Sequence, residues 1–386
     1  MGDKKSKFKL NLLDEPKSSS LLSLIDVDRA ISELRQGRSV AIRGANGKAL
    51  IAHASEGLNQ EIFQKLTQFS DGTPSLAITA RRAAVLGLNQ SKGKIVTLTT
   101  DPPLTAETAI AIANPLVDLN LQQISISSRI AQFFDSENAA ITLTKLARLL
   151  PSALTAPLNS HEPLDLGDWS LRHKIALVNA GDIFQYERAA TESLYIASDA
   201  RVPLAAAENT RVVAFRPHDG GIEHLAIIIG SPDPKKPVLT RIHSECFTGD
   251  ILGSLRCDCG EQLRGAITKI SARGSGILLY LAQEGRGIGL VNKLRAYSLQ
   301  DFGFDTVDSN EQLGFEADER FFFPAARMLQ LLGYKRINLM TNNPKKILGL
   351  EACGVQVVTR VAHKFASNKH NEKYLRTKAQ RGDHLI

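Results

Sequence analysis

Residues 276–297 read GILLYLAQEGRGIGLVNKLRAY, and they give the clearest indication of the fold class. Gly276–Ala282 is a short apolar run with the length of a buried strand. Glu284–Gly289 is a glycine-rich turn, and Leu290–Tyr297 has a helical pattern. A strand, a glycine-rich turn and a helix in this order are typical of a sheet covered by helices, so we predict an α/β fold.

The same alternation continues on both sides of this stretch. Upstream, Leu225–Gly230 and Val238–His243 have the apolar runs of strands, and we expect them to be neighbours in the sheet. The helix after them is expected to end at Gly274. Downstream, Ile337–Thr341 is a further predicted strand, and Asn343 is expected to cap the next helix.

The first half of the chain is less regular. Short apolar runs such as Ser39–Ile42 and Ile95–Leu98 alternate with helical patterns such as Ile141–Leu150, which predicts an α/β or α+β domain. The stretch Pro151–Trp169 is the best candidate for a linker. We therefore divide the chain into a disordered tail (residues 1–22), an N-terminal domain (23–170), a C-terminal domain (171–364) and a second tail (365–386).

Composition limits the class of protein. A chain of 386 residues with 43% apolar and 23% charged residues is ordinary globular material with room for two domains. We see neither an apolar run of about 18 residues for a membrane span nor an apolar signal peptide, so we expect a cytoplasmic protein without a membrane partner. The net charge of +7 and the pI near 9.2 suit a nucleic acid or a triphosphate substrate alike.

Three of the four cysteines, Cys246, Cys257 and Cys259, lie within fourteen positions of one another. This clustering favours zinc over a disulfide framework. A helix that begins at Cys257 and Cys259 would favour the thiolate forms of these two cysteines. Buried reduced cysteines are the alternative, but the surrounding loop is polar. His243 as a fourth ligand would make the site structural, whereas an open fourth position would make it catalytic. Cys353 lies apart, and we expect it to pack in the core.

Two turns have the properties of anion sites. The glycines around Arg286 would let the backbone approach an anion, and the guanidinium adds a planar fork of donors. Lys345 and Lys346 place positive charge in the first turn of a predicted helix, where a bound anion would compensate it. A turn that needs glycine only for its backbone, and a solvated lysine pair, are the alternatives.

The second half carries a set of motifs in the order and spacing of GTP cyclohydrolase II, which it therefore resembles. These motifs are Arg241–Cys246, Thr248–Asp250, Gly253–Gly260, Gln283–Leu290, Asn292–Tyr297, Asp305–Thr306, Leu313–Phe315, Asp318–Arg320 and Thr341–Lys346.

The resemblance implies an α/β enzyme of riboflavin synthesis. Such an enzyme hydrolyses GTP to 2,5-diamino-6-(5-phosphoribosylamino)pyrimidin-4(3H)-one, formate and diphosphate. Its single zinc ion per chain is held at positions that match the three clustered cysteines, and it activates the water that attacks C8 of guanine. Mg²⁺ on the diphosphate and a homodimer are also implied, and no nucleic-acid partner is expected.

The resemblance assigns roles to individual residues as well. Asp318 matches the proton acceptor, and Tyr297 matches an active-site tyrosine that favours complete ring opening. Arg320 matches the proposed nucleophile at the α-phosphate, although a guanidinium is a poor nucleophile and a good electrostatic clamp. The residues that match contacts to GTP are Arg241, Ile242, His243, Ser244, Glu245, Gln262, Glu284, Gly285, Arg286, Thr306, Thr341 and Lys346.

Two departures from the family pattern stand out in this half. Asp308-Ser309 replaces the usual glutamate and alanine, and the run Phe321–Pro324 is unlike the usual continuation after Arg320. Neither falls on a matched catalytic position, but we expect the aromatic run to change the packing beside Arg320.

The first half resembles 3,4-dihydroxy-2-butanone 4-phosphate synthase, the usual fusion partner, at Ala30–Ile42 and Leu146–Pro151. That enzyme needs acidic residues after its first strand to bind magnesium and enolise ribulose 5-phosphate. The corresponding segment here, Arg43–Ala49, has no carboxylate. We therefore expect an α+β domain that keeps the fold without this activity, and its role in dimerisation or regulation stays open.

Other functions remain open from the residues alone. The chain can be a paralogue that acts on a related nucleotide or stops at another product. It can also be a zinc-containing nucleotide sensor, but Asp318, Arg320 and Tyr297 argue against a protein that only binds.

Overall fold

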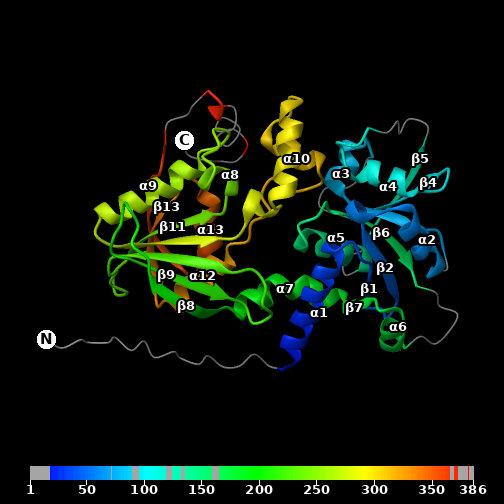
Figure 1. Cartoon of the computed structure of the whole chain (residues 1–386), viewed down its shortest axis with the longest axis horizontal. Coiled ribbons are helices and arrows are strands. Elements are labelled where there is room, and N and C mark those ends of the chain that lie inside the picture. Colours follow the sequence, from blue (N-terminus) through cyan, green and yellow to red (C-terminus); the bar gives the residue numbers. More distant parts are fainter. Residues whose placement is uncertain are drawn as a thin grey trace.

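The computed structural model describes residues 18–70, 72–88, 95–118, 124–131, 135–158, 165–365, 369–372 and 381. Within these residues the strands form two sheets, which Figure 1 shows as two lobes joined by the helix α7 (Ala180–Glu192). We call residues 18–179 the N-terminal lobe and residues 195–365 the C-terminal lobe. The predicted tails lie largely outside the described residues, but the first helix already begins at Ser18.

The N-terminal lobe is a seven-stranded, mostly antiparallel sheet with helices packed against it. Helix α1 covers it with Val27, Ala30, Ile31 and Leu34, which recur at helical spacing and are all buried. In spatial order the strands are β5 (Ser125–Ile130), β4 (Ile95–Asp101), β3 (Ser75–Thr79), β6 (Ser152–Pro157), β2 (Ala49–Ala54), β1 (Val40–Arg43) and β7 (Ala176–Asn179). The helices are α1 (Ser18–Arg35), the 3₁₀ turn η1 (Ser55–Gly57), α2 (Gln60–Gln68), α3 (Ala80–Val85), α4 (Ala106–Ala113), α5 (Ser136–Leu146) and α6 (Leu166–His173).

The C-terminal lobe is built on a mixed seven-stranded sheet. In spatial order its strands are β14 (Gln356–Val361), β13 (Arg336–Met340), β11 (Val238–Ser244), β12 (Gly276–Leu281), β10 (His224–Ile229), β9 (Thr210–Arg216) and β8 (Tyr195–Arg201). The helical segments are α8 (Phe247–Asp250), α9 (Cys259–Ala272), the 3₁₀ turn η3 (Glu284–Gly287), α10 (Leu290–Asp301), α11 (Thr306–Gln312), α12 (Phe323–Leu331) and α13 (Pro344–Glu351).

Parallel pairing in this second sheet positions the site. Strands β11, β12 and β13 run in the same direction, with Ser244 paired to Leu281 at their carboxyl ends. Loops that leave the carboxyl ends of parallel strands meet at one edge of the sheet. The cysteine loop, η3 and the start of α13 therefore converge, although they lie far apart in the sequence.

Most predicted elements of this lobe are confirmed, including the strand–turn–helix at residues 276–297 and the cap at Asn343, whose side chain accepts from Lys345 N–H. One expectation is wrong, because β10 and β11 are not neighbours. Strand β12 lies between them, antiparallel to β10 and parallel to β11. The chain reaches this place through α9, since a parallel pair needs a long crossover rather than a short turn.

The predicted linker also needs correction. Its first part is β6, which is buried in the middle of the first sheet, and its prolines at 151 and 157 bound the strand instead of interrupting it. Residues 159–164 lie outside the described residues. The predicted boundary at residue 170 falls inside α6, and β7 beyond it pairs with β1 in the first sheet. The first sheet therefore extends past that boundary, and the division into domains remains a prediction.

Candidate metal centre and nucleotide pocket

One pocket lies at the carboxyl edge of β11, β12 and β13. Its empty space, out to open solvent, is about 1100 Å³. Nearly all of the predicted site residues line it. These are Arg241, His243, Ser244, Glu245, Cys246, Cys257, Cys259, Gln262, Glu284, Gly285, Arg286, Tyr297, Thr306, Arg320, Thr341 and Lys346.

Two predicted residues do not line the pocket. Ile242 is 1% exposed and packs in the core, because successive side chains of a strand point to opposite faces of the sheet. Its contribution is its carbonyl oxygen, which accepts a hydrogen bond from Lys346 Nζ at 3.2 Å. Asp318 accepts hydrogen bonds from Arg320, which does line the pocket.

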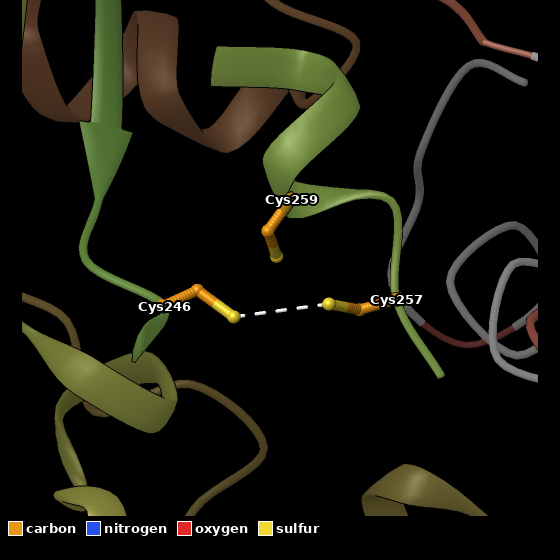
Figure 2. A group of neighbouring side chains, drawn as sticks. All are labelled: Cys246, Cys257 and Cys259. Carbon is orange, nitrogen blue, oxygen red and sulfur yellow. Dashed lines mark hydrogen bonds between the residues drawn. The ribbon is translucent and has the colours of Figure 1, made fainter. Parts of the chain in front are cut away.

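The three predicted cysteine ligands converge at the pocket wall. Their sulfur atoms all lie within 4.8 Å of one another, and the Sγ atoms of Cys246 and Cys257 are 3.7 Å apart. Figure 2 shows Cys246 after β11, Cys257 in the following loop and Cys259 at the first turn of α9, with all three side chains directed toward a common centre. Cys353 lies elsewhere and packs against the core of the sheet, as expected.

The chemistry of the three sulfurs fits a soft metal ion. Hydrogen bonds from Cys257, Cys259 and Lys293 lower the pKa of Cys246. The hydrogen bond that the Cys257 thiol makes to the Cys246 sulfur raises the pKa of Cys257 to about 11. Three adjacent thiolates repel one another unless a cation lies between them. Among the described residues, no histidine, aspartate or glutamate joins this cluster of possible ligands. Three protein ligands with a fourth position for water is the arrangement of a catalytic zinc site.

A buried lysine stands beside the cysteines. The ammonium of Lys293 contacts Cys246 Sγ at 3.0 Å, Thr248 Oγ1 at 2.8 Å and Glu284 Oε1 at 2.9 Å. Burial lowers the pKa of Lys293, but the hydrogen bonds to Cys246 and Glu284 outweigh it and raise the pKa above its ordinary value. The lysine is therefore charged and compensates part of the negative charge of the sulfurs.

His243 is held by a carboxylate rather than by the cysteines. Asp250 lies 3.0 Å from His243 Nε2 and accepts hydrogen bonds from Cys246 N–H and the Tyr280 hydroxyl, both at 3.0 Å. Burial lowers the pKa of His243, so its ring is neutral and Nε2 donates to the carboxylate. Its Nδ1 is buried and has no hydrogen-bond partner among the described residues, so it can accept a hydrogen bond.

The glycine-rich turn needs its glycines for its backbone conformation, which was the alternative to an anion site. Gly285, Arg286 and Gly287 all have positive φ, at 63°, 61° and 99°. A Cβ at Gly287 would lie 2.8 Å from the carbonyl oxygen of Glu319, so only glycine fits there without a shift. Two backbone groups hold the Glu284 carboxylate, which accepts hydrogen bonds from Phe247 N–H at 2.6 Å and from Gly285 N–H at 2.9 Å.

Cations surround the rest of the pocket. Arg241 is 6% exposed and donates to Met340 O at 2.9 Å and to Gln262, which in turn donates to Asp258. Burial lowers the pKa of Arg241 to about 10, and Asp258 opposes this shift. Lys346, 6% exposed, reaches the same wall from the start of α13. This charge suits a polyphosphate.

Arg320 lines the pocket, and Asp318, which does not, holds its side chain. Its backbone N–H and Nε donate to Asp318 Oδ1 at 3.1 and 2.7 Å, and its guanidinium lies 5.6 Å from the centre of the Phe322 ring. Burial raises the pKa of Asp318, but the hydrogen bonds and charge of Arg320 outweigh it and hold the pKa below its usual range. The aromatic run thus packs beside Arg320, as the sequence led us to expect, and Phe322 also lies 5.6 Å from Lys346 Nζ.

Tyr297 and Thr306 close the pocket from α10 and α11. Two cations lie near the Tyr297 ring, with Arg256 at 5.1 Å and Lys293 at 5.8 Å from its centre. Burial raises the pKa of Tyr297 to about 12, so its hydroxyl is protonated near neutral pH and can donate a hydrogen bond. Thr306 follows Asp305, which caps α11.

Sequence reasoning missed two residues of the site. Lys293 was part of a matched motif without a role, although it stands four residues before Tyr297 and so shares its helix face. Asp250 was likewise part of a motif, and nothing in the local pattern indicates that it holds His243. Only the fold brings the strand end at His243 back against the turn that carries Asp250.

Comparisons with known proteins agree on a family. Residues 195–362 match the family model described as GTP cyclohydrolase II. The chain is 52% identical to GTP cyclohydrolase-2 of Azospirillum brasilense over 362 residues, which covers 93% of this chain and 94% of that protein. It is 36% identical to riboflavin biosynthesis protein RibBA of Salinispora tropica over 318 residues, which covers 81% of this chain and 78% of that protein.

Among solved structures, the chain is similar to RibBX, a two-domain 3,4-dihydroxy-2-butanone 4-phosphate synthase from A. baumannii, at 15% identity and a TM-score of 0.37. The match covers 88% of this chain and 99% of that chain. At this TM-score the similarity supports no conclusion about what the N-terminal lobe does. Within the described residues, no helix is long and apolar enough to cross a membrane.

Proposed function

This chain belongs to the GTP cyclohydrolase II family, and from that premise we propose how its pocket carries out the reaction. The enzyme hydrolyses GTP to 2,5-diamino-6-(5-phosphoribosylamino)pyrimidin-4(3H)-one, formate and diphosphate, a step of riboflavin synthesis. The observation that carries the assignment to this pocket is the juxtaposition of three convergent thiols with a wall of buried cations. One end suits a metal and the other suits a triphosphate.

Zinc is the ion we propose for Cys246, Cys257 and Cys259, one per chain, because thiolates are soft ligands and the described residues add no fourth one. When bound, zinc supplies Lewis-acid activation of the water that hydrolyses the imidazole ring. Lys293 keeps the Cys246 sulfur in its thiolate form. Neutral His243 presents Nδ1 as an acceptor for a donor group of the substrate.

Arg241, Arg286, Arg320 and Lys346 are proposed to bind the triphosphate, with Mg²⁺ on the departing diphosphate. Arg320 is proposed as an electrostatic clamp rather than a nucleophile, since its guanidinium is a delocalised cation held by a carboxylate and an aromatic ring. A guanylyl adduct trapped on Arg320 would overturn this assignment.

Asp318 is proposed as the proton acceptor, and its pairing with Arg320 explains how it would be controlled. In the ion pair the depressed pKa makes Asp318 a weak base. When Arg320 turns to a substrate phosphate, the carboxylate loses this partner and its basicity rises. Tyr297 is proposed to donate a hydrogen bond near the reacting ring, because its hydroxyl is protonated near neutral pH.

A homodimer is proposed for the whole chain. Large apolar side chains are exposed on the loop after α8 and on α10, namely Ile251 (69%), Leu252 (66%), Leu255 (58%), Val291 (57%) and Leu294 (48%). Arg256 joins the two segments through hydrogen bonds to Tyr297 O and Asp301. Clustered exposed apolar groups are typical of a protein interface.

The four free cysteines favour a reducing compartment, so we propose the cytoplasm.

The N-terminal lobe is proposed to lack 3,4-dihydroxy-2-butanone 4-phosphate synthase activity. The turn after β1 contributes Gly44, Asn46 and Lys48 to a nearby pocket, and none of these is a carboxylate that could bind magnesium. Turnover of ribulose 5-phosphate above background by the purified protein would contradict this proposal.

The test of the main proposal is incubation of the purified protein with GTP, Zn²⁺ and Mg²⁺, followed by measurement of formate, diphosphate and the diaminopyrimidine. We expect all three products in equal amounts. GTP that binds without conversion would instead indicate a nucleotide sensor, and formate-free ring opening would indicate a paralogue with another product.

A further inference from the structure

The N-terminal lobe contacts, at several places, the segments of the C-terminal lobe that carry the pocket residues. Figure 1 shows α10 on the side of the C-terminal lobe that faces α3 and α5. Leu150 of the N-terminal lobe is 2% exposed and packs in one cluster with Ile288, Ala296, Leu313 and Phe315 of the C-terminal lobe. The lobes therefore share a small core directly behind η3 and α10.

Polar contacts fix the same elements. Arg148 donates to Ala282 O at 2.7 Å, and its own carbonyl accepts from Asn292 Nδ2 at 3.1 Å. Glu56 binds Arg295 through both carboxylate oxygens, at 2.8 and 2.9 Å. Ala282 precedes the glycine-rich turn, and Asn292 and Arg295 flank Lys293 on α10, so these contacts hold the pocket wall from outside.

The segment before Asp318 is held most densely. Thr79 donates its hydroxyl to Gly314 O at 2.7 Å, and buried Arg82 donates to Gln312 O at 3.0 Å. Arg81 reaches Glu311 at 2.6 Å and contacts both carboxylate oxygens of Glu316. All of these donors come from the junction of β3 and α3.

One ion pair between the lobes involves the residue that separates Asp318 from Arg320 in the sequence. Lys145 Nζ of α5 lies 2.7 Å from Glu319 Oε1, with the side chains 29% and 20% exposed. Glu319 stands between Asp318 and Arg320 in the sequence. The same carboxylate oxygen accepts Glu316 N–H at 2.9 Å, and Glu319 N–H donates to Arg286 O at 3.1 Å. Lys145 thus anchors a node that links the Asp318–Arg320 segment to the glycine-rich turn.

We propose that Lys145 is a positioning residue for the cyclohydrolase reaction, and that the N-terminal lobe serves as a fixed support that sets the placement of Asp318 and Arg320 through Glu319. The proposal rests on the proposed roles of those two residues. Lys145 lies outside the pocket lining, so it acts through Glu319 and not on the substrate. Loss of the anchor lets the segment shift, and displacement of a clamp by about 1 Å costs up to about a hundredfold in rate.

The test compares Lys145→Met, Glu319→Gln and the double variant in the full-length, zinc-loaded protein. We expect each single substitution to lower kcat about tenfold to a hundredfold with a smaller change in KM for GTP. The double variant should be no slower than the slower single variant, because both substitutions remove the same anchor. Lys145→Arg should recover most of the lost kcat, and zinc content should not change.

Lys65→Met is the matched control. Lys65 forms an ion pair with Glu61 at the same 2.7 Å on the exposed face of α2, far from the contacts described above, so its loss should leave kcat unchanged. If Lys145→Met does not fold, the charge-swapped pair Lys145→Glu with Glu319→Lys replaces it, and we expect the pair to exceed Lys145→Glu alone in kcat.

Three results would overturn the positioning role. The first is an unchanged kcat in Lys145→Met, and the second is a decrease in kcat in the double variant that equals the product of the two single decreases. The third is a kcat that neither Lys145→Arg nor the charge-swapped pair restores. A wild-type protein and a Lys65→Met variant that both release no formate from GTP would refute the proposed function instead. The two failures are therefore distinguishable.

Discussion

Replacement of Lys293 by methionine removes the ammonium that contacts the Cys246 sulfur. Methionine keeps a similar length but has no charge or donor. Three contacts disappear, to Cys246 Sγ at 3.0 Å, Thr248 Oγ1 at 2.8 Å and Glu284 Oε1 at 2.9 Å. The side chains of Lys293 and Glu284 are only 10% and 4% exposed, so water replaces little of the lost interaction.

The size of the effect follows from this burial. Groups that orient a metal ligand without touching the metal typically change its affinity by about 10- to 100-fold. We expect a fall of that size in zinc affinity, equivalent to about 1.4 to 2.7 kcal/mol, because thiolates without the ammonium compete less well against their protons. The uncompensated Glu284 carboxylate should also lower the free energy of unfolding by about 3 kcal/mol, the low end for a broken buried ion pair, since two backbone N–H groups still bind it.

Zinc affinity is measured by competition with a chromophoric chelator at fixed pH, and stability by urea unfolding of the zinc-loaded protein. Lys269→Met is the control, because Lys269 lies near the end of the same helix as Cys259 and donates to Ala362 O. A folded Lys293→Met variant with wild-type zinc affinity would show that the ammonium does not stabilise the metal-binding thiolates, and an equal loss in the control would show that the effect is not specific to Lys293.

Three further tests address other parts of the structure. Cys257→Ser should lose the bound zinc, whereas Cys353→Ser should retain both zinc and activity, as measured by metal analysis; equal zinc content in the two variants would contradict the assigned ligands. Gly287→Ala should lower kcat/KM for GTP at least about tenfold, because its Cβ would meet the Glu319 carbonyl oxygen at 2.8 Å with φ at +99°; wild-type kinetics would show that the turn tolerates the side chain. Burial and the neighbouring Asp135 raise the pKa of Glu137 from 4.5 to about 7, so the folded state holds an extra proton between these values and stability falls as pH rises through them. In the wild type, the free energy of unfolding measured with urea should therefore fall between pH 4.5 and 7, and Glu137→Gln should reduce this fall by about 1 to 3 kcal/mol. If the variant and the wild type lose the same free energy of unfolding over this range, the Glu137 carboxyl is not the cause of the pH dependence.

Much of the site could be predicted because its residues stand next to elements with strong local signals. Cys257 and Cys259 lie at the start of a helix with clear periodicity, and Arg286 lies in a turn whose glycines are visible in the sequence. The order of the strands could not be predicted in the same way. Apolar runs identify β10 and β11, but which strand lies between them depends on a crossover of more than thirty residues that no local pattern encodes.

Long-range polar contacts were invisible to sequence for a related reason. Lys145 and Glu319 are ordinary charged residues on surface-like positions of their own elements, and their proximity arises only after the two lobes pack. His243 and Asp250 lie only seven residues apart in one lobe, but their pairing depends on how the turn at α8 folds against the end of β11, and it sets the tautomer of a pocket residue. Periodicity predicts which face of an element is buried, but it does not predict which charged side chain stands opposite.

The two proposed properties of the N-terminal lobe, loss of its own catalysis and support of the other lobe, do not conflict, because they depend on different faces. The pocket after β1 is lined by Lys48, Arg129 and Glu137, among others. Contacts to the C-terminal lobe come instead from Glu56, the β3–α3 junction and the end of α5 with the turn after it. Substitution in the first set leaves the second set in place. A lobe that supports Asp318 and Arg320 therefore needs an intact fold and an intact interface, and it needs no carboxylates in the loop between β1 and β2.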